Sequence, residues 1–298
     1  MRRWWTYLQE RFPPLENGLL VGVFSLSALW HSALLRGQSD LPGLRSALVA
    51  FGLTLLFFFL LRVADEFKDL DKDRRYRPER PVPRGLIGLR ELGAAGAAAA
   101  AVQLGLAAWV DGTLLLVLLG TWAWFGLMCV EFFVPDWLDD RPALYMLSHM
   151  VIMPGIALLA AGADWAAAAA VPPASFAWFL GASFGGGLVF EIGRKIRAPD
   201  GERTGVETYS KAWGRPRAVS AWLLAMLLAS GLAVGAAGAV GRAPTGAGIL
   251  GVALVGAVVV ALRFLRHPTP DRAESVEQIS GIWLLLLYGS VGLLPVVA

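Results

Sequence analysis

The chain of 298 residues contains nine runs of about 20 mostly apolar residues, separated by charged, proline or glycine positions. A helix needs about 20 such residues to cross about 30 Å of hydrocarbon. Only 16% of the residues are charged and 56% are hydrophobic, whereas about a quarter of a soluble chain is charged. We therefore predict an all-α, polytopic membrane protein. The expected spans are residues 17–36, 42–64, 91–110, 112–133, 144–162, 174–193, 217–240, 246–265 and 277–297.

The basic residues are distributed unequally between the two ends of these spans. The N-terminal segment and the loops after the second, fourth, sixth and eighth spans hold 22 of the 26 Lys and Arg residues. The opposite end holds only Arg36, Arg45 and Arg242. Because basic loops stay in the cytoplasm, we predict an integral cell membrane protein with a cytoplasmic N-terminus and an external C-terminus. Residues 1–16, which are charged and aromatic, are expected to form a cytoplasmic interfacial lead-in.

Other classes of protein are disfavoured by the composition. The single cysteine, Cys129, excludes an intramolecular disulfide and a cysteine metal site. The net charge of +3 is modest, and we expect the membrane lipid bilayer, and no nucleic acid, as a partner. We expect residues 1–298 to form one transmembrane domain. Glycine- and alanine-rich stretches such as residues 181–187 predict close packing of helix backbones.

Acidic residues recur every four positions where the second span ends. If the helix continues past Ala64, the carboxylates of Asp65, Asp69 and Asp73 form one stripe with Glu66 on its edge. Like charges at this spacing repel, and a hard divalent cation relieves the repulsion. The alternative is a solvated helix end that nearby cations neutralise; these are Lys68, Lys72, Arg74 and Arg75.

A proline-fixed basic turn follows this stripe. Residues 77–85 read Arg-Pro-Glu-Arg-Pro-Val-Pro-Arg-Gly and return positive groups toward the acids. Mg²⁺ is usually bound by one or two carboxylates together with water and substrate phosphate oxygens. Carboxylates among cations therefore favour a diphosphate that is bridged by a metal ion, with Arg77 and Arg80 as contacts.

These residues resemble the UbiA superfamily of intramembrane prenyltransferases. The first family signature is Asn-Asp-x-x-Asp-x-x-x-Asp at the end of the second span, followed by Arg-Pro-x-Arg-Pro-x-x-x-Gly. Asp65 stands at the Asn, and Glu66, Asp69 and Asp73 stand at the three Asp positions. The tail of the signature is matched by Arg77, Pro78, Arg80, Pro81 and Gly85.

The resemblance implies a fold and an activity. The nine helices would be bundled around a central lipid-accessible cavity, with active-site loops at residues 65–90 and 191–216 on the cytoplasmic side. Mg²⁺ would be the cofactor and a polyprenyl diphosphate the substrate, and ionisation would give an allylic cation for a hydrophobic acceptor that the sequence does not identify. The implied catalytic and metal-binding residues are Asp65, Glu66, Asp69, Asp73 and Glu191, with Lys68, Lys72, Arg77 and Arg80 on the substrate.

The second active-site loop departs from the family pattern. Many members have two or three aspartates before a Gly-x-x-Thr stretch, whereas the helical part here has only Glu191, and Gly205 with Thr208 fits the stretch. Basic residues stand where another acid is expected and can contact phosphate directly; these are Arg194, Lys195 and Arg197. Tyr209 and Lys211 are further candidate phosphate contacts. Pairing of Glu191 with Lys195 one helical turn later is the alternative role for that acid, and a solvated loop is the alternative for Asp200, Glu202 and Glu207.

Three isolated polar positions have two interpretations each. Asn17 at the start of the first span is a candidate substrate contact, and helix capping explains it equally well. Glu131 belongs to an acidic loop after the fourth span, which is either a cap on the cavity or a solvated segment. His149 is an acid or base near the reacting centre or, as we favour, a core histidine.

Three functions remain open from the sequence. The leading hypothesis is a prenyltransferase of the UbiA type. A terpene cyclase on the same scaffold, in which a double bond of the substrate's own chain attacks the cation, is the alternative, and the altered second motif favours a divergent branch. A membrane transporter is a distant alternative, because transporters place ionisable groups near the midplane and these acids lie at helix ends.

Overall fold

The computed structural model describes residues 2–38, 40 and 42–294, and all its regular secondary structure there is helical. The long helices are α2 (Pro14–Leu35), α3 (Leu44–Lys68), α5 (Leu89–Val110), α6 (Gly112–Cys129), α8 (Pro142–Met150), α9 (Ile152–Trp165), α10 (Ala177–Arg194), α12 (Arg215–Ala239), α13 (Ala243–Arg266) and α14 (Pro270–Tyr288). The short ones are α1 (Arg2–Arg11), α4 (Leu70–Tyr76), α7 (Pro135–Asp139), α11 (Tyr209–Trp213), and the single turns Glu131–Phe133, Ala174–Phe176, Pro199–Gly201 and Gly289–Leu293.

Nine helical segments within these described residues are long and apolar enough to cross a membrane, which confirms the predicted number. The fifth, Pro142–Trp165, breaks at Val151 between α8 and α9, because Pro154 has no N–H to donate to the carbonyl of Met150. The ninth begins at Pro270 rather than near residue 277, since its charged first turns continue the helix beyond the apolar run. Residues 295–297 of the predicted ninth span lie outside the described residues.

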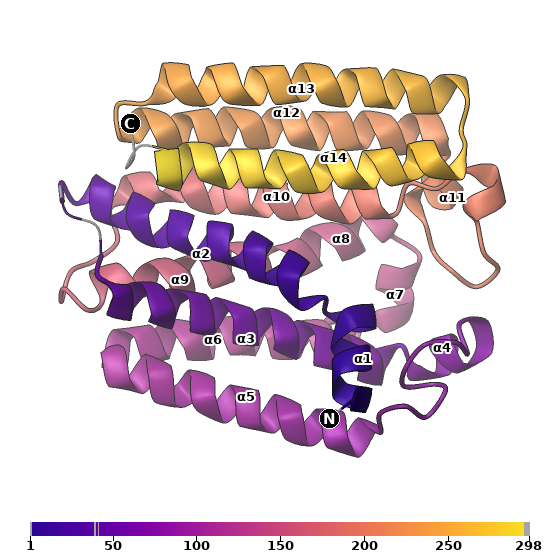
Figure 1. Cartoon of the computed structure of the whole chain (residues 1–298), viewed down its shortest axis with the longest axis horizontal. Coiled ribbons are helices and arrows are strands. Elements are labelled where there is room, and N and C mark those ends of the chain that lie inside the picture. Colours follow the sequence, from indigo (N-terminus) through magenta and orange to yellow (C-terminus); the bar gives the residue numbers. More distant parts are fainter. Residues whose placement is uncertain (1, 39, 41, 295–298) are drawn as a thin grey trace.

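The bundle has two halves that α2 and α10 help to join. In one half α10 packs against α12 and α14, and α12 packs against α13; in the other, α3 packs against α2, α5 and α9. α2 also contacts α14 and α9, and α9 contacts α10. Figure 1 shows the short helices α1, α4, α7 and α11 at one end of the bundle, so the two predicted active-site loops share that end.

Glycines allow the close packing of α10 that the sequence predicts. A Cβ added to Gly185 would lie 2.6 Å from Cβ of Ala229 on α12, and one on Gly193 would lie 2.2 Å from Oγ of Ser280 on α14. Both distances are far below van der Waals contact, so only glycine fits there. The close approach fixes the end of α10 that carries Glu191.

The lead-in helix α1 covers the end of the bundle where the loops gather. Tyr7 is fully buried among Val63, Val82, Ile87 and Leu92. The N-terminal segment is therefore a packed part of this end. The central lipid-accessible cavity stays a prediction, whereas a cavity at the loop end is described below.

Candidate active site

The aspartate stripe survives a break in the helix that carries it. α3 continues past Ala64 to Lys68, where Asp69 caps it, and α4 begins at Leu70, so the helix is interrupted at Asp69. Backbone hydrogen bonds nevertheless run from the N–H of Asp69 to the carbonyl of Asp65 (2.9 Å) and from that of Asp73 to Asp69 (2.7 Å). This i→i−4 pattern keeps the three residues one turn apart. Burial, followed by the nearby charges of Asp65 and Asp73, raises the pKa of Asp69.

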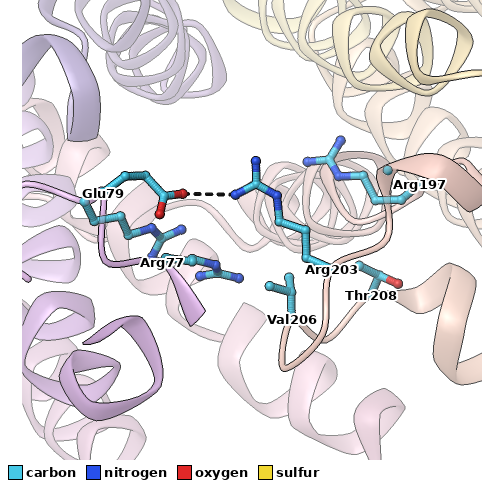
Figure 2. A pocket seen from close by; sticks show the side chains of 8 residues that line it. Arg77, Glu79, Arg197, Arg203, Val206 and Thr208 are labelled. Carbon is cyan, nitrogen blue, oxygen red and sulfur yellow. Dashed lines mark hydrogen bonds and ion pairs between the residues drawn. The ribbon is translucent and has the colours of Figure 1, made fainter. Parts of the chain in front are cut away.

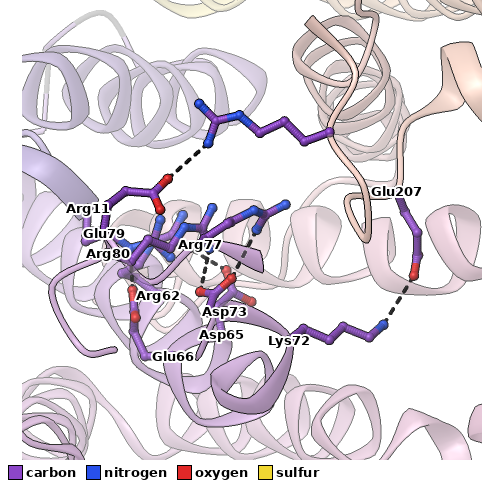
Figure 3. Close-up of polar contacts among 11 residues, drawn as sticks. Arg11, Arg62, Asp65, Glu66, Lys72, Asp73, Arg77, Glu79, Arg80 and Glu207 are labelled. Carbon is purple, nitrogen blue, oxygen red and sulfur yellow. Dashed lines mark hydrogen bonds and ion pairs between the residues drawn. The ribbon is translucent and has the colours of Figure 1, made fainter. Parts of the chain in front are cut away.

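Asp73 is occupied by arginines of the basic turn. Its side chain is only 2% exposed, and its Oδ2 lies 2.6 Å from Nη1 of Arg80 and its Oδ1 3.3 Å from Nη1 of Arg77 (Figure 3). The proline-fixed turn therefore returns its cations to the acids, as its sequence predicts. Burial and the charge of Arg80 lower the pKa of Arg77, so positive charge is crowded here.

Glu66 faces away from the aspartates. Its side chain is 1% exposed and its Oε1 accepts a hydrogen bond of 2.5 Å from Nε of Arg11 on α1. Tyr7 lies on α1, like Arg11, and its pKa is raised by burial and then by the charge of Glu66. Glu66 thus anchors α1 to the end of α3, and the structure does not bring it together with the other predicted metal ligands.

The acid of the second loop is neutralised by its own helix end. Glu191 is buried; its Oε1 lies 2.7 Å from Nζ of Lys195, and its Oε2 accepts a hydrogen bond of 2.7 Å from Nε of Arg194. This is the i+4 pairing anticipated as the alternative role of Glu191. Lys195 also lies 5.4 Å from the ring of Tyr209, whose pKa is raised by burial and then by Glu191.

The remaining candidates of the second half have various partners. Arg197 pairs with Glu277 on α14 (3.1 Å), and Glu202 accepts the hydroxyl hydrogen bond of Thr208 (2.8 Å). The backbone N–H of Lys211 donates to Oγ1 of Thr208, which caps α11. In the first half, Nδ2 of Asn17 donates to the carbonyl of Pro13 (2.9 Å), so its observed role is local.

Two ion pairs and a tight contact join the two loops. Nζ of Lys72 lies 3.2 Å from Oε1 of Glu207, and Nη1 of Arg203 lies 3.0 Å from Oε1 of Glu79. Gly205 has a φ of +73°, and a Cβ there would lie 2.4 Å from the ring of Tyr76. A side chain at this position is excluded twice, by the left-handed backbone and by the ring.

Between the loops lies a basic cavity of about 380 Å³. Figure 2 shows Arg203 reaching toward Glu79 at its edge, with Arg77 and Arg197 from the two loops nearby. Four arginines against one carboxylate make it suited to a multiply charged anion such as a diphosphate. The lining residues are Arg77, Glu79, Arg80, Arg197, Gly201, Arg203, Val206 and Thr208.

Two pairs of residues near this end were not anticipated as partners. Arg203 and Glu79 are single charges in polar loops, and nothing in their spacing signals that they pair across 124 positions. Lys68, predicted on the substrate, instead forms an ion pair with Glu131 and donates to Oη of Tyr145 (2.7 Å). Glu131, whose side chain is 12% exposed, therefore belongs to the interior of this end of the bundle.

The carboxylates fit a metal ion only together with a substrate. Among residues 2–38, 40 and 42–294, no group of three or more Asp, Glu, His or Cys side chains is arranged to hold one. Asp65 is half exposed and pairs only with Arg62, at 3.3 Å. The pKa of Asp69 is raised by burial and by its acidic neighbours, so a cation would stabilise its ionised form. Two carboxylates completed by phosphate oxygens and water are the usual ligands of Mg²⁺, so Asp65 and Asp69 fit this ion.

Comparison with known sequences gives one family. The sequence model of the UbiA prenyltransferase family matches residues 23–285, which is most of the chain. No curated protein sequence matches the chain.

Solved structures share the fold at low sequence identity. A UbiA homolog from Aeropyrum pernix K1 in its apo form gives a TM-score of 0.69 at 16% identity, over 91% of this chain and 96% of that one. A digeranylgeranylglyceryl phosphate synthase gives 0.62 at 16%, over 98% and 99%. A UbiA homolog from Archaeoglobus fulgidus, bound to DMAPP and Mg²⁺, gives 0.53 at 16%, over 94% and 99%. The fold of this chain is thus shared by these three solved structures.

Proposed function

Because the chain belongs to the UbiA prenyltransferase family, we propose that it is a Mg²⁺-dependent intramembrane prenyltransferase. It binds a polyprenyl diphosphate, ionises it and transfers the prenyl group to an acceptor. The observation that carries the proposal is the cavity lined by four arginines at the end of the bundle where both loops meet. Two of these arginines, Arg77 and Arg80, pair with Asp73 of the aspartate stripe. The Archaeoglobus fulgidus homolog with the same fold binds DMAPP and Mg²⁺, which supports this ligand class.

The two loops divide the diphosphate between them. We assign Arg77 and Arg80 of the first loop and Arg197 and Arg203 of the second to the phosphate oxygens, because these side chains line one cavity. Asp73 holds Arg77 and Arg80 in place through both of its carboxylate oxygens. Preorganised guanidinium groups stabilise negative charge without rearranging during the reaction.

A metal ion would complete the anion site. Asp65 and Asp69 would hold Mg²⁺, which supplies a Lewis acid to the leaving diphosphate. When the bond between C1 and the bridging oxygen breaks, the electron pair leaves with the diphosphate, and the arginines neutralise the added charge. We propose that an outer set of residues contributes positive potential and hydrogen bonds; these are Lys72, Arg194, Lys195, Tyr209 and Lys211. Glu66 and Glu191 support the site indirectly, because Glu66 pairs with Arg11 and Glu191 pairs with Arg194 and Lys195.

The proposed location follows from the same arrangement. We propose that the loop end faces the cytoplasm, because it carries the basic loops that the positive-inside rule places there. A diphosphate from the cytoplasm would then enter the polar end while its chain lies among the apolar helices.

The direct test is pyrophosphate release by the purified protein. Geranyl, farnesyl and geranylgeranyl diphosphates are incubated with Mg²⁺, first alone and then with quinone precursors or polar lipids as acceptors. The proposal expects Mg²⁺-dependent release that requires an acceptor and gives a prenylated product. A cyclic hydrocarbon or alcohol formed without acceptor would identify the terpene cyclase instead, and no release under any condition would refute both.

A further inference from the structure

A buried acid–histidine pair, which has no role in the proposed metal site, is joined through Lys68 to the end of α3 that precedes Asp69. Oε2 of Glu131, in the turn after α6, lies 3.3 Å from Nε2 of His149 on α8. The two side chains are 12% and 10% exposed, and neither of these two atoms has another hydrogen-bond partner within the described structure. Such orphaned polar atoms are uncommon in protein interiors.

The hydrogen bonds of the ring leave one proton position for this pair to share. Nδ1 of His149 lies 2.8 Å from the carbonyl oxygen of Tyr145, and a carbonyl oxygen can only accept, so Nδ1 carries the hydrogen. In the neutral ring Nε2 is then a bare acceptor, and it faces a carboxylate oxygen, which is also an acceptor. One proton placed between them satisfies both atoms. The pair is therefore built to receive a proton.

The surroundings connect this pair to the reacting end. Lys68 contacts the other oxygen of Glu131 and is the residue before Asp69, one helical turn after Asp65. Tyr145 donates to the same oxygen (3.2 Å) and stacks on the His149 ring, with ring centroids 4.0 Å apart. α8 also packs against α10, the helix of Glu191. The charged or titratable groups near the pair are Lys68, Tyr145, Cys129 and Glu191.

An unusual backbone holds the acid in this position. Glu131, Phe132 and Phe133 have φ angles of 47°, 52° and 62°, in the left-handed region that non-glycine residues rarely adopt. Phe132 packs edge-on against both Trp124 and His149, with centroid distances of 5.3 and 5.8 Å. Three such residues in succession persist only when the surrounding contacts dictate them, and strained backbone of this kind clusters at functional sites.

We propose that Glu131 and His149 together accept the proton that the acceptor loses during prenyl transfer. The inference rests on the proposed transferase and applies to any acceptor that loses a proton from its attacking position. The C1–oxygen bond of the diphosphate breaks with its electron pair, the acceptor forms a bond to C1, and its proton moves to the Glu131–His149 pair. Diphosphate and one bound proton are the balancing products.

Conservative variants separate this role from ionisation. We compare His149→Gln and Glu131→Gln with the exposed control His267→Gln, using geranylgeranyl diphosphate that carries ¹⁸O in the bridging position. Scrambling of the label reports C1–oxygen cleavage, and product formation with 4-hydroxybenzoate or a glycerol ether lipid reports transfer. General-base catalysis is typically worth about 100- to 10,000-fold, so transfer should fall by that factor while scrambling persists. Unchanged transfer, or equal loss of scrambling, would overturn the proposal.

A spectroscopic measurement tests the proton site without any substrate. The chain has only three histidines, so ring ¹⁵N spectra of histidine-labelled protein can be assigned with single variants. We expect the protonation of His149 with falling pH to shift in Glu131→Gln and to remain unchanged in Asp71→Asn. An unchanged His149 titration in Glu131→Gln contradicts the shared proton. If wild-type protein shows neither scrambling nor transfer, the prenyltransferase proposal fails while this measurement still decides the pair.

Discussion

The ends of α3 and α10 carry the two acidic motifs of the molecule, and they use their carboxylates differently. At α3 the cations are unequally shared: Asp73 pairs with two arginines, whereas Asp65 has only a 3.3 Å pair and the pKa of Asp69 is raised by burial and its acidic neighbours. At α10 the single acid Glu191 is buried between Arg194 and Lys195 of its own helix. The first end has acid oxygens left for a metal ion, whereas at the second both oxygens of the one acid are already paired with cations.

The comparison predicts unequal work for the two ends. Metal binding belongs to the first end, and the second contributes mainly cations to the cavity, through Arg197 and Arg203. Sequence signatures that treat the two acidic motifs as equivalents would miss this difference, because it depends on which partners the acids have.

The largest effect is expected at the first end. Asp69→Asn should reduce turnover by at least about 1000-fold, because metal-assisted stabilisation of a leaving group is worth several kcal/mol. Pyrophosphate release at saturating Mg²⁺ measures it, and Asp71→Asn, whose side chain is 98% exposed, is the matched control. Near-normal release by Asp69→Asn, or equal loss in both variants, would remove the metal from this end.

The same helix end gives a stability effect. Glu66→Ala leaves the guanidinium of Arg11, only 12% exposed, without its carboxylate, and breaking such a buried pair costs about 3–5 kcal/mol. Thermal unfolding of the detergent-solubilised protein should therefore occur at lower temperature than in Asp71→Ala. Adding Arg11→Ala should recover part of the loss. A fully stable Glu66→Ala protein that has lost Mg²⁺ binding would instead restore Glu66 as a metal ligand.

A smaller effect is expected at the second end. Glu191→Gln frees Arg194 and Lys195, which are 42% and 32% exposed and can turn toward water. Mg²⁺ dependence should be kept and turnover should fall by no more than about 10-fold, equivalent to about 1.4 kcal/mol. The Mg²⁺ concentration for half-maximal release is the measurement. A shift as large as that in Asp69→Asn would make the two ends equivalent.

The smallest effect is expected for the link between the ends. Glu79 and Arg203 are 62% and 67% exposed, and such surface pairs contribute about 0–1 kcal/mol. Glu79→Gln should leave stability unchanged, whereas Arg203→Gln should weaken pyrophosphate binding severalfold because it removes a cation from the cavity. If both variants bind pyrophosphate with the same affinity, Arg203 forms the ion pair with Glu79 but does not contact the diphosphate.

The sequence predicts the fold well because the dominant force is local to each span. Nine apolar runs of sufficient length must become helical in a bilayer, and the part of the chain that the structure describes contains nine such segments. The deviations have local causes: Pro154 divides the fifth span, and the left-handed turn at Glu131 ends the fourth at Cys129 rather than near residue 133.

The site is less predictable because its side chains find partners far away in the chain. Spacing correctly aligns Asp65, Asp69 and Asp73, since an i→i−4 pattern depends on neighbours only. It cannot reveal that Glu66 turns to Arg11, 55 positions earlier, or that Lys68 meets Glu131. These partners are determined by how α1 and the turn after α6 pack on the end of α3.

The central claim is that Asp65 and Asp69 bind a prenyl diphosphate through Mg²⁺ beside the four arginines. Calorimetric titration of geranylgeranyl diphosphate into the purified protein, with Mg²⁺ or with EDTA, tests it most directly. We predict binding that weakens at least 100-fold when Mg²⁺ is removed, a similar weakening in Asp69→Asn, and none in Asp71→Asn. Equal affinity with and without Mg²⁺, or an Asp69→Asn protein that keeps the Mg²⁺ effect, would contradict the assignment.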